Sequence, residues 1–326
     1  MCISTVFPRG LRGELLEPMK YLITGGAGFI GSHLADALAG NHELVLVDNL
    51  ANGRMENIRH LLESRAVTFI RGSITDSPLL SECMEGVEGV FHEAALVSVL
   101  RSVKDPVPTN EANVTGTLKV LVAARDAGVK AVVFASSSSV YGDAPVLPKR
   151  EDMPPMPKSP YAISKVAGEH YMRVFSELYG IRTVSLRYFN VFGPRQDPDS
   201  PYAAVIPRFI TRLLRSEPLI IHGDGGQTRD FTYVRDVVQG NLKAMESSAR
   251  GVFNLACGQR NSILDLARTV MAVAGREVPV HHEKPREGDI RDSLADISAA
   301  RERLKYAPGY NLRTGLEETV PWYMTS

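Results

Sequence analysis

From Lys20 onward, short apolar runs alternate with longer segments in which apolar residues recur at helical spacing. The short runs predict buried strands and the longer segments predict amphipathic helices. The expected strands are KYLIT (20–24), ELVLVDN (43–49), VTFIRG (67–72), GVFHEAAL (89–96), KAVVFASS (130–137) and TVSLRYFN (183–190). The expected helices include residues 29–40, 113–128 and 159–180. This alternation predicts an α/β protein with a doubly wound parallel sheet and helices on both faces.

The alternation changes after Asn190, where loops rich in Pro, Gly and Asp separate shorter elements. Residues 234–248 predict a helix and residues 251–258 a strand, and we expect residues 234–258 to return to the main sheet. The remainder of 191–326 is expected to form a smaller C-terminal α/β lobe that binds substrate. Residues 19–190 are the expected first domain. Residues 1–18 are treated as an N-terminal extension, because charged residues interrupt any apolar signal region.

The composition argues against two kinds of partner. Lys+Arg and Asp+Glu each number 37, so no net charge attracts nucleic acid or an anionic membrane surface. No apolar run reaches the roughly 18 residues of a spanning helix, so we expect no membrane association. Cys2, Cys83 and Cys257 lack CxxC spacing. We therefore expect no disulfide framework and a reducing, cytoplasmic location.

The stretch TGGAGFIG follows the first expected strand and opens the first expected helix. The spacing of Gly25, Gly28 and Gly31 lets backbone N–H groups approach a pyrophosphate at a helix N-terminus. Asp48 ends the second strand, where a carboxylate accepts hydrogen bonds from an adenosine ribose and repels a 2′-phosphate. The sequence therefore predicts a Rossmann-type domain that binds NAD. Arg54 could favour NADP, but a solvated arginine in a polar loop is the preferred interpretation.

The stretch YAISK places Tyr161 and Lys165 on one face of a helix. A free tyrosine, with a pKa of about 10, is a poor base at neutral pH. A nearby ammonium, together with a positive nicotinamide ring, favours the phenolate. The serine cluster FASSSSVYG ends the preceding strand. These two signals together predict a catalytic site in a dinucleotide-binding fold.

With these motifs the chain resembles the extended short-chain dehydrogenase/reductases of the NAD-dependent epimerase/dehydratase family, specifically the nucleotide-sugar epimerases. The resemblance extends from Met19 to Tyr323. Its motifs, in order, are TGGAGFIG, HEAA, NVTGT, SSVYG, YAISK, RYFNVFGPRQDP, AAVIP, GDGGQTRDF and REGDIRDSLAD. It implies a transient oxidation at sugar C4 with hydride transfer to NAD.

The resemblance also implies roles for individual residues. Tyr161 resembles the catalytic base, Lys165 its electrostatic partner and ribose ligand, and Ser137 the serine that binds the sugar 4-hydroxyl. The implied NAD-binding residues are Gly25, Gly28, Phe29, Ile30, Gly31, Asp48, Asn49, Ser73, Ile74, Ala94, Asn113, Tyr161, Lys165 and Tyr188. The implied UDP-sugar-binding residues are Ser138, Ser139, Asn190, Ala204, Val205, Arg229, Arg286, Asp289 and Ser293.

Several of these positions have a more specific implied role. Asn190, Arg229 and Arg286 match residues that hold the UDP phosphates, and guanidinium groups suit phosphate oxygens. Asp289 resembles the acid that binds the uridine ribose, while Ala204 and Val205 fall where the family contacts the base. Asn113 resembles an asparagine that supports the active site. Ser73 is a departure, because the family commonly has aspartate there to bind the adenine amino group.

The reaction is predicted from Ser138 and Ser139. The related dehydratases carry an Asp-Glu pair at these positions, and relatives that decarboxylate UDP-glucuronate carry Glu at the second. A serine hydroxyl does not readily replace those acids and bases. We therefore expect a 4-epimerase, in which a transient 4-keto sugar rotates and takes back the hydride on its other face.

The sugar is predicted from Ser293, which lies where tyrosine in related epimerases excludes an N-acetyl group. The resemblance is thus to enzymes that interconvert UDP-GlcNAc and UDP-GalNAc, and often UDP-Glc and UDP-Gal. Two alternatives remain: a UDP-glucuronate 4-epimerase and a non-catalytic NAD-binding sensor on the same fold. The family also implies a homodimer that packs through helices around residues 104–126 and 161–180.

Histidines are not expected to bind a metal. His281 and His282 are adjacent in a strand-like run, so their side chains point to opposite faces. His92, at the end of a strand, is expected to be a packed, hydrogen-bonded histidine rather than a catalyst.

Overall fold

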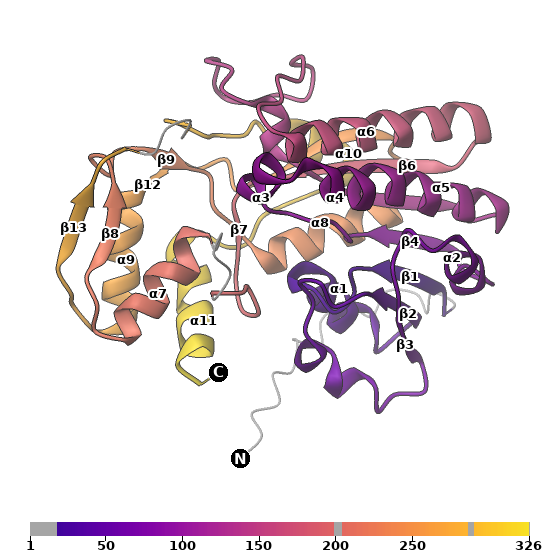
Figure 1. Ribbon diagram of the computed structural model, residues 1–326, viewed down its shortest axis with the longest axis horizontal. Helices are drawn as coiled ribbons and strands as arrows, with labels where there is room; N and C mark the ends of the chain where they lie inside the picture. Colours follow the sequence, from indigo (N-terminus) through magenta and orange to yellow (C-terminus); the bar gives the residue numbers. More distant parts are fainter. Residues whose placement is uncertain (1–17, 199–203, 286–289, 326) are drawn as a thin grey trace.

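The computed structural model describes residues 18–198, 204–285 and 290–325. Its main sheet has seven parallel strands in the order β11-β6-β5-β4-β1-β2-β3 (Figure 1). The strands are β1 (Lys20–Thr24), β2 (Glu43–Asp48), β3 (Val67–Arg71), β4 (Gly89–His92), β5 (Ala131–Ser137), β6 (Arg182–Tyr188) and β11 (Gly251–Leu255). Every strand expected before Asn190 is present, and the strand expected over residues 251–258 pairs with β6 in this sheet.

Helices cover both faces of the sheet. One face packs against α1 (Phe29–Leu38), α8 (Val234–Glu246) and α10 (Ser298–Leu304). The other packs against α2 (Ser77–Cys83), α5 (Gly116–Asp126) and α6 (Pro160–Tyr179). Because both faces are covered, the central strands are apolar at nearly every position, which is why they are readily recognised in the sequence.

The order of the strands reverses between β1 and β4. β1 pairs with β2 on one side and with β4 on the other, so the connections that follow β1 and β4 diverge at this point. In open α/β sheets, ligands bind in the crevice beyond the carboxyl ends of the strands at such a switch point. Gly25, at the end of β1, and Glu93, at the end of β4, therefore mark the expected position of the site.

A smaller lobe lies beside the main sheet (Figure 1). Its apolar cluster is built mainly from α7 (Val205–Leu214), α9 (Ile263–Ala274), α11 (Leu312–Thr325) and the parallel pair β8 (Leu219–His222) and β13 (Val280–Glu283). Two further strand pairs are β7 (Val191–Phe192) with β10 (Thr232–Tyr233), and β9 (Thr228–Arg229) with β12 (Asn261–Ser262). Phe29 and Ile30 of α1 also pack against this cluster, so the lobe contacts the first turn of α1.

The segment before α5 differs from the expectation. A helix was expected from residue 113, but α3 (Val99–Lys104) and α4 (Pro106–Asn110) precede a π-helical turn over Glu111–Thr115, and α5 begins at Gly116. Pro106 takes the first position of α4, where its missing N–H has no helical partner in any case. A π turn widens one turn of helix and is common near functional sites. Sequence periodicity does not reveal such a turn.

Candidate active site

A cleft of about 790 Å³ lies between the carboxyl end of the main sheet and the lobe. From the expected cofactor set it is lined by Gly25, Gly28, Phe29, Ile30, Gly31, Asp48, Asn49, Ser73, Ile74, Ala94, Tyr161, Lys165 and Tyr188. From the expected catalytic and substrate set it is lined by Ser137, Ser138, Ser139, Asn190, Ala204, Arg229 and Ser293. Residues that are far apart in the sequence thus meet in one cavity.

The glycine turn at the start of α1 leaves no room for side chains. A Cβ on Gly31 would lie 2.1 Å from the Gly25 carbonyl oxygen, and one on Gly25 would lie 2.8 Å from the Ala94 nitrogen. Gly28 caps α1 without a side-chain hydrogen bond, so the first N–H groups of the helix are left for a ligand. The turn therefore has the shape and polarity of a pyrophosphate cradle.

Asp48 is held at the end of β2 by backbone groups. Its carboxylate accepts hydrogen bonds from the N–H of Ala27 at 3.1 Å and of Leu50 at 2.7 Å. Burial raises the pKa of Asp48, while these backbone hydrogen bonds oppose that shift. A Cβ on Gly53 would lie 2.7 Å from a carboxylate oxygen of Asp48, so the loop packs closely over it. A fixed carboxylate here fits an adenosine ribose and disfavours a 2′-phosphate.

Two members of the expected cofactor set have local partners. The hydroxyl of Ser73 lies 2.8 Å from that of Thr75 and accepts a hydrogen bond from the Thr75 N–H, although Ser73 also lines the cleft. Asn113 is among the residues behind the cleft rather than those that line it. Its side chain bonds both backbone groups of Leu96 and donates to the hydroxyl of Ser164 at 3.0 Å. Asn113 thus supports the wall of the cleft from behind, and its contact with the cofactor stays a prediction.

The four serines at the end of β5 have different surroundings. Ser136 donates to Glu169 at 2.5 Å and is buried, as expected for a residue that supports the loop. Ser137 accepts a hydrogen bond from the N–H of Ser139 at 3.2 Å and also hydrogen-bonds the phenol of Tyr161. The hydroxyl of Ser139 is buried and has no partner among the described residues. The loop therefore presents hydroxyl groups, and no carboxylate, to the cleft.

Tyr161 and Lys165 lie on the buried face of α6. Ser159 caps this helix by accepting a hydrogen bond from the N–H of Ala162, and Pro160 begins it. Burial raises the pKa of Tyr161 to about 12, and the hydrogen bond from Ser137 acts in the opposite direction. Burial lowers the pKa of Lys165 to about 8. The protein groups alone thus keep Tyr161 a phenol at neutral pH, and the expected phenolate requires the further positive charge of an oxidised nicotinamide ring.

Glu93 is a residue of the cleft whose role the sequence reasoning missed. It follows β4 and accepts a hydrogen bond from the hydroxyl of Tyr188 at 2.9 Å. Burial raises the pKa of Glu93 to about 7, and Lys165 opposes the shift. In turn, the negative charge of Glu93 raises the pKa of Lys165. The sequence did carry a signal for Glu93, since it is an acidic residue directly after a buried strand. A carboxyl in that position needs a hydrogen-bond or ionic partner.

The lobe side of the cleft is held together by Asp230. This fully buried carboxylate accepts hydrogen bonds from the N–H groups of Cys257, Gly258 and Ala295, at 3.0 to 3.2 Å. Its neighbour Arg229 lines the cleft from β9. Asp230 thereby joins the segment that carries Arg229 to two others, at residues 257–258 and at Ala295.

Asn190 and Ser293 complete the lobe wall of the cleft. Asn190 has a positive φ of 37° and donates to the carbonyl of Asp230 at 3.1 Å. Asparagine tolerates this conformation better than most residues. The N–H of Ser293 donates to the carbonyl of Thr228 at 3.1 Å, which places Ser293 beside β9.

A second cavity of about 290 Å³ continues from the cleft into the lobe. It shares Asn190, Ala204 and Arg229 with the cleft, and Val205 also lines it. Ala204 caps α7 without a side-chain hydrogen bond, so the first N–H groups of α7 are left for a ligand. Arg286 and Asp289 of the expected substrate set lie outside the described residues.

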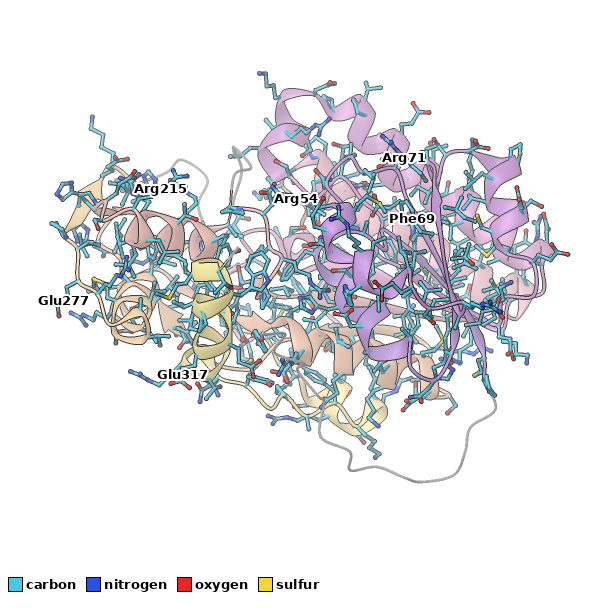
Figure 2. All side chains as sticks on the ribbon, turned by 90° about the horizontal axis from the view of Figure 1, so that it is seen from below. Arg54, Phe69, Arg71, Arg215, Glu277 and Glu317 are labelled. Atoms are coloured by element: carbon cyan, nitrogen blue, oxygen red, sulfur yellow. The ribbon has the colours of Figure 1, made fainter. Side chains whose placement is uncertain are left out.

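A short segment, Pro194–Asp197, connects the lobe to α1, and we refer to it as the strap. Its polar contacts with the main domain are Pro194 with His33 (3.0 Å), Arg195 with Asp36 (2.8 Å) and Asp197 with Arg54 (2.7 Å), and Gln196 bonds Val191 and Tyr323. Arg54 is half exposed, and Figure 2 shows it on the side of the main domain that faces the lobe. Arg54 is therefore part of a contact between the two halves of the molecule.

His92 is packed and hydrogen-bonded, as the sequence suggested. His92 is buried between the hydroxyls of Thr24 and Thr117, at 2.7 and 2.9 Å, and burial lowers its pKa to about 3. His281 and His282 are consecutive residues of β13. Among the described residues, no group of three or more His, Cys, Asp or Glu side chains is arranged to hold a metal ion. No described helix is long and apolar enough to span a membrane.

Comparison with known proteins agrees with this geometry. The model of the NAD-dependent epimerase/dehydratase family matches residues 21–256. The chain is 40% identical over 309 residues to a UDP-glucose 4-epimerase of Mycolicibacterium smegmatis, covering 94% of this chain and 98% of the relative.

Solved structures match equally well. A UDP-N-acetylglucosamine 4-epimerase from Methanobrevibacter ruminantium M1 is 40% identical with a TM-score of 0.92, covering 95% of this chain and 99% of that one. A UDP-glucuronic acid 4-epimerase from Bacillus cereus, solved with UDP-glucuronic acid and NAD, is 35% identical with a TM-score of 0.87, covering 94% and 99%.

The fold and the cleft are those of a short-chain dehydrogenase/reductase, and the chain belongs to the NAD-dependent epimerase/dehydratase family. Within that family it is an isomerase, a nucleotide-sugar 4-epimerase, and its cofactor is NAD. The residues present fit this cofactor, since the glycine turn leaves space for a pyrophosphate and Asp48 offers its carboxylate to a ribose.

Proposed function

We propose that the protein interconverts UDP-GlcNAc and UDP-GalNAc, and also UDP-Glc and UDP-Gal. The observation that carries this proposal is the serine loop, where Ser138 and Ser139 offer hydroxyl groups at the positions that carry acids in related dehydratases. Ser293, on the lobe wall of the same cleft, is a small residue where a tyrosine would reduce the space. Both features support inversion at C4 and room for an acetamido group at C2.

The proposed roles follow from the positions of the side chains. Ser137 hydrogen-bonds the sugar 4-hydroxyl and relays its proton to Tyr161, which is the base, and the same path returns the proton when the 4-keto sugar is reduced. When bound, NAD accepts the C4 hydride and later returns it. Lys165 remains an ammonium at neutral pH, because its pKa is about 8, and it stabilises negative charge on Tyr161.

The cleft and the second cavity suggest how the nucleotide is held. Arg229 and Asn190 border both cavities, which supports a role for them at the diphosphate between sugar and base. In this arrangement the first N–H groups of α7, which begins at Val205 after its cap Ala204, face the base. Arg286 and Asp289 are proposed from the sequence to bind the second phosphate and the uridine ribose.

A substrate panel tests the proposal. Purified protein given UDP-GlcNAc without reductant should yield a mixture with UDP-GalNAc, because the reaction has no net redox change. Conversion of UDP-glucuronate alone would support the alternative uronate epimerase. Folded, NAD-loaded protein that converts no UDP-sugar would support a sensor. Ser293→Tyr should lose turnover of UDP-GlcNAc while it keeps that of UDP-Glc, and equal loss of both would contradict the assignment of Ser293.

We further propose a homodimer in the cytoplasm. Apolar side chains on the outer side of α3, α4 and α6 are exposed, and these helices lie side by side (Figure 1). The exposed residues are Val99, Leu100, Val103, Val107 and Ile163. A surface of this kind favours association with a second copy. Sedimentation equilibrium should give twice the mass of the chain, and Val103→Lys with Val107→Lys should give the monomer.

A further inference from the structure

Four cationic side chains are among the described residues that line the cleft, namely Lys149, Lys165, Arg195 and Arg229. Three of them have a place in the account above. Lys165 is the electrostatic partner of Tyr161. Arg195, in the strap, pairs with Asp36 of α1, and Arg229 borders the proposed diphosphate position. Lys149 has no role in that account, although it is only 4% exposed.

The backbone of Lys149 is fixed against the segment that carries Ser293. The N–H of Lys149 donates to the carbonyl of Leu294 at 2.8 Å, and its carbonyl accepts from the N–H of Asp296 at 2.9 Å. This pairing bridges Lys149 to Ala295 in parallel. Ala295 lies two positions after Ser293, and alternate residues of extended backbone share a face. Lys149 and Ser293 therefore enter the cleft from the same side.

Lys149 is also close to the end of the serine loop, because its ammonium donates to the carbonyl of Ala144. Ser138, Ser139 and Gly142 line the cavity together with Lys149 and Ser293. Lys149 is thus adjacent to both segments that the proposed function assigns to the sugar. Its backbone pairs with residues 294–296, and its ammonium contacts the end of the serine loop at Ala144.

The ammonium of Lys149 retains donors for a ligand. It donates to the carbonyl of Ala144, the acceptor found for it among the described residues. An ammonium carries three N–H donors, so two remain. The carboxylate of Asp143 lies on the same loop and forms an ion pair with Lys158 at 3.2 Å. A buried ammonium with donors to spare is costly unless a ligand oxygen or water accepts them.

We propose that Lys149 donates a hydrogen bond to the carbonyl oxygen of the 2-acetamido group and so selects N-acetylated sugars. In this arrangement Ser293 provides the space for the substituent, and Lys149 provides the interaction. The inference rests on the proposed function, because it concerns the sugar that the same site accepts. A hydrogen bond to a charged donor is worth about tenfold to a hundredfold in affinity.

The experiment compares kcat/KM for UDP-GlcNAc, UDP-Glc and UDP-glucuronate in the wild type, Lys149→Met and Lys149→Arg. Lys149→Met should lower the value for UDP-GlcNAc by about tenfold to a hundredfold and leave UDP-Glc within about twofold. Lys149→Arg, which keeps a charged donor, should recover part of the loss. Lys158→Met, on the same loop but exposed, is the matched control and should change none of the values.

Each other outcome contradicts the inference in a recognisable way. An equal loss of kcat/KM for UDP-GlcNAc and UDP-Glc would mean that Lys149 supports the loop through Ala144 and does not distinguish between the sugars. Selective loss with UDP-glucuronate would identify a carboxylate as the group that Lys149 binds. Wild-type protein that converts UDP-Glc but not UDP-GlcNAc would overturn the proposed substrate itself. If the wild type converts both and Lys149→Met lowers both equally, only the inference about Lys149 is overturned.

Discussion

The ammonium of Lys165 lies 5.8 Å from the centre of the Tyr161 ring and donates a hydrogen bond to the carbonyl of Ala135 at 2.8 Å. Ala135 belongs to β5, two residues before Ser137, so one hydrogen bond joins α6 to the strand that ends in the serine loop. The phenol, the ammonium and the serine hydroxyl are therefore held in a common frame by secondary structure. Their relative positions do not depend on a flexible loop.

Replacing the phenol should abolish proton transfer without removing the cofactor site. Tyr161→Phe is expected to lower kcat by about a hundredfold to ten-thousandfold, the usual contribution of a positioned acid or base. NAD bound per chain, measured in the denatured protein extract, should stay at the wild-type value. A variant that kept its kcat would show that another group accepts the proton.

The charge of Glu93 should set the alkaline limit of activity. Glu93 raises the pKa of Lys165, so Glu93→Gln should lower that pKa below its present value of about 8. Lys165 then loses its proton at a lower pH, and the alkaline limb of the kcat profile moves to lower pH. The control is Glu88→Gln, whose carboxylate pairs with Lys130 at the surface. If the alkaline limb does not move in Glu93→Gln, Glu93 does not control the pKa of Lys165 and acts only through its hydrogen bond to Tyr188.

The glycine turn offers a test with a matched control. Gly31→Ala would place a Cβ 2.1 Å from the Gly25 carbonyl oxygen, so the turn must shift and the pyrophosphate cradle is lost. We expect NAD content and activity to fall together by at least tenfold. Gly40→Ala, at the end of α1 with nothing within 4 Å of the added Cβ, should leave both unchanged. Normal NAD content in Gly31→Ala would contradict the cradle.

The buried ion pair behind the serine loop should dominate stability. Glu169 accepts two hydrogen bonds from Arg187, at 2.8 and 2.7 Å, and their side chains are 7% and 4% exposed. Arg187→Met leaves the carboxylate of Glu169 buried without its cation, although still bonded to Ser136, which should cost about 3–5 kcal/mol in the free energy of unfolding. Urea denaturation measures this loss.

The control for that measurement is an exposed pair on the same helix. Arg173 and Glu177 lie 3.3 Å apart with side chains 62% and 59% exposed. Arg173→Met should change the free energy of unfolding by less than about 1 kcal/mol. Similar losses in the two variants would mean that the buried pair is not a special contribution to stability.

The parts of the molecule that could be predicted from the sequence have local signals. The strands of the main sheet are nearly continuous apolar runs because helices cover both of its faces, and the glycine turn and YAISK carry their chemistry at fixed spacing. The positions of Glu93 and Lys149 depend on neighbours far away in the chain, Tyr188 and Leu294. No pattern within one segment could indicate those contacts. The π turn before Gly116 was missed for a related reason, since it changes the helical period itself.

The strap links the lobe to the part of the main domain that forms the expected cofactor site. A cycle that ends with NAD in the form in which it began contains no step that requires the cofactor to leave. The strap contacts α1, the helix whose N-terminus faces the expected dinucleotide site, at His33 and Asp36, and it contacts the loop after β2 at Arg54. Gln196 of the strap also lines both the cleft and the second cavity. One short segment therefore borders the expected cofactor site and the proposed nucleotide site, so exchange at either site takes place next to the same residues.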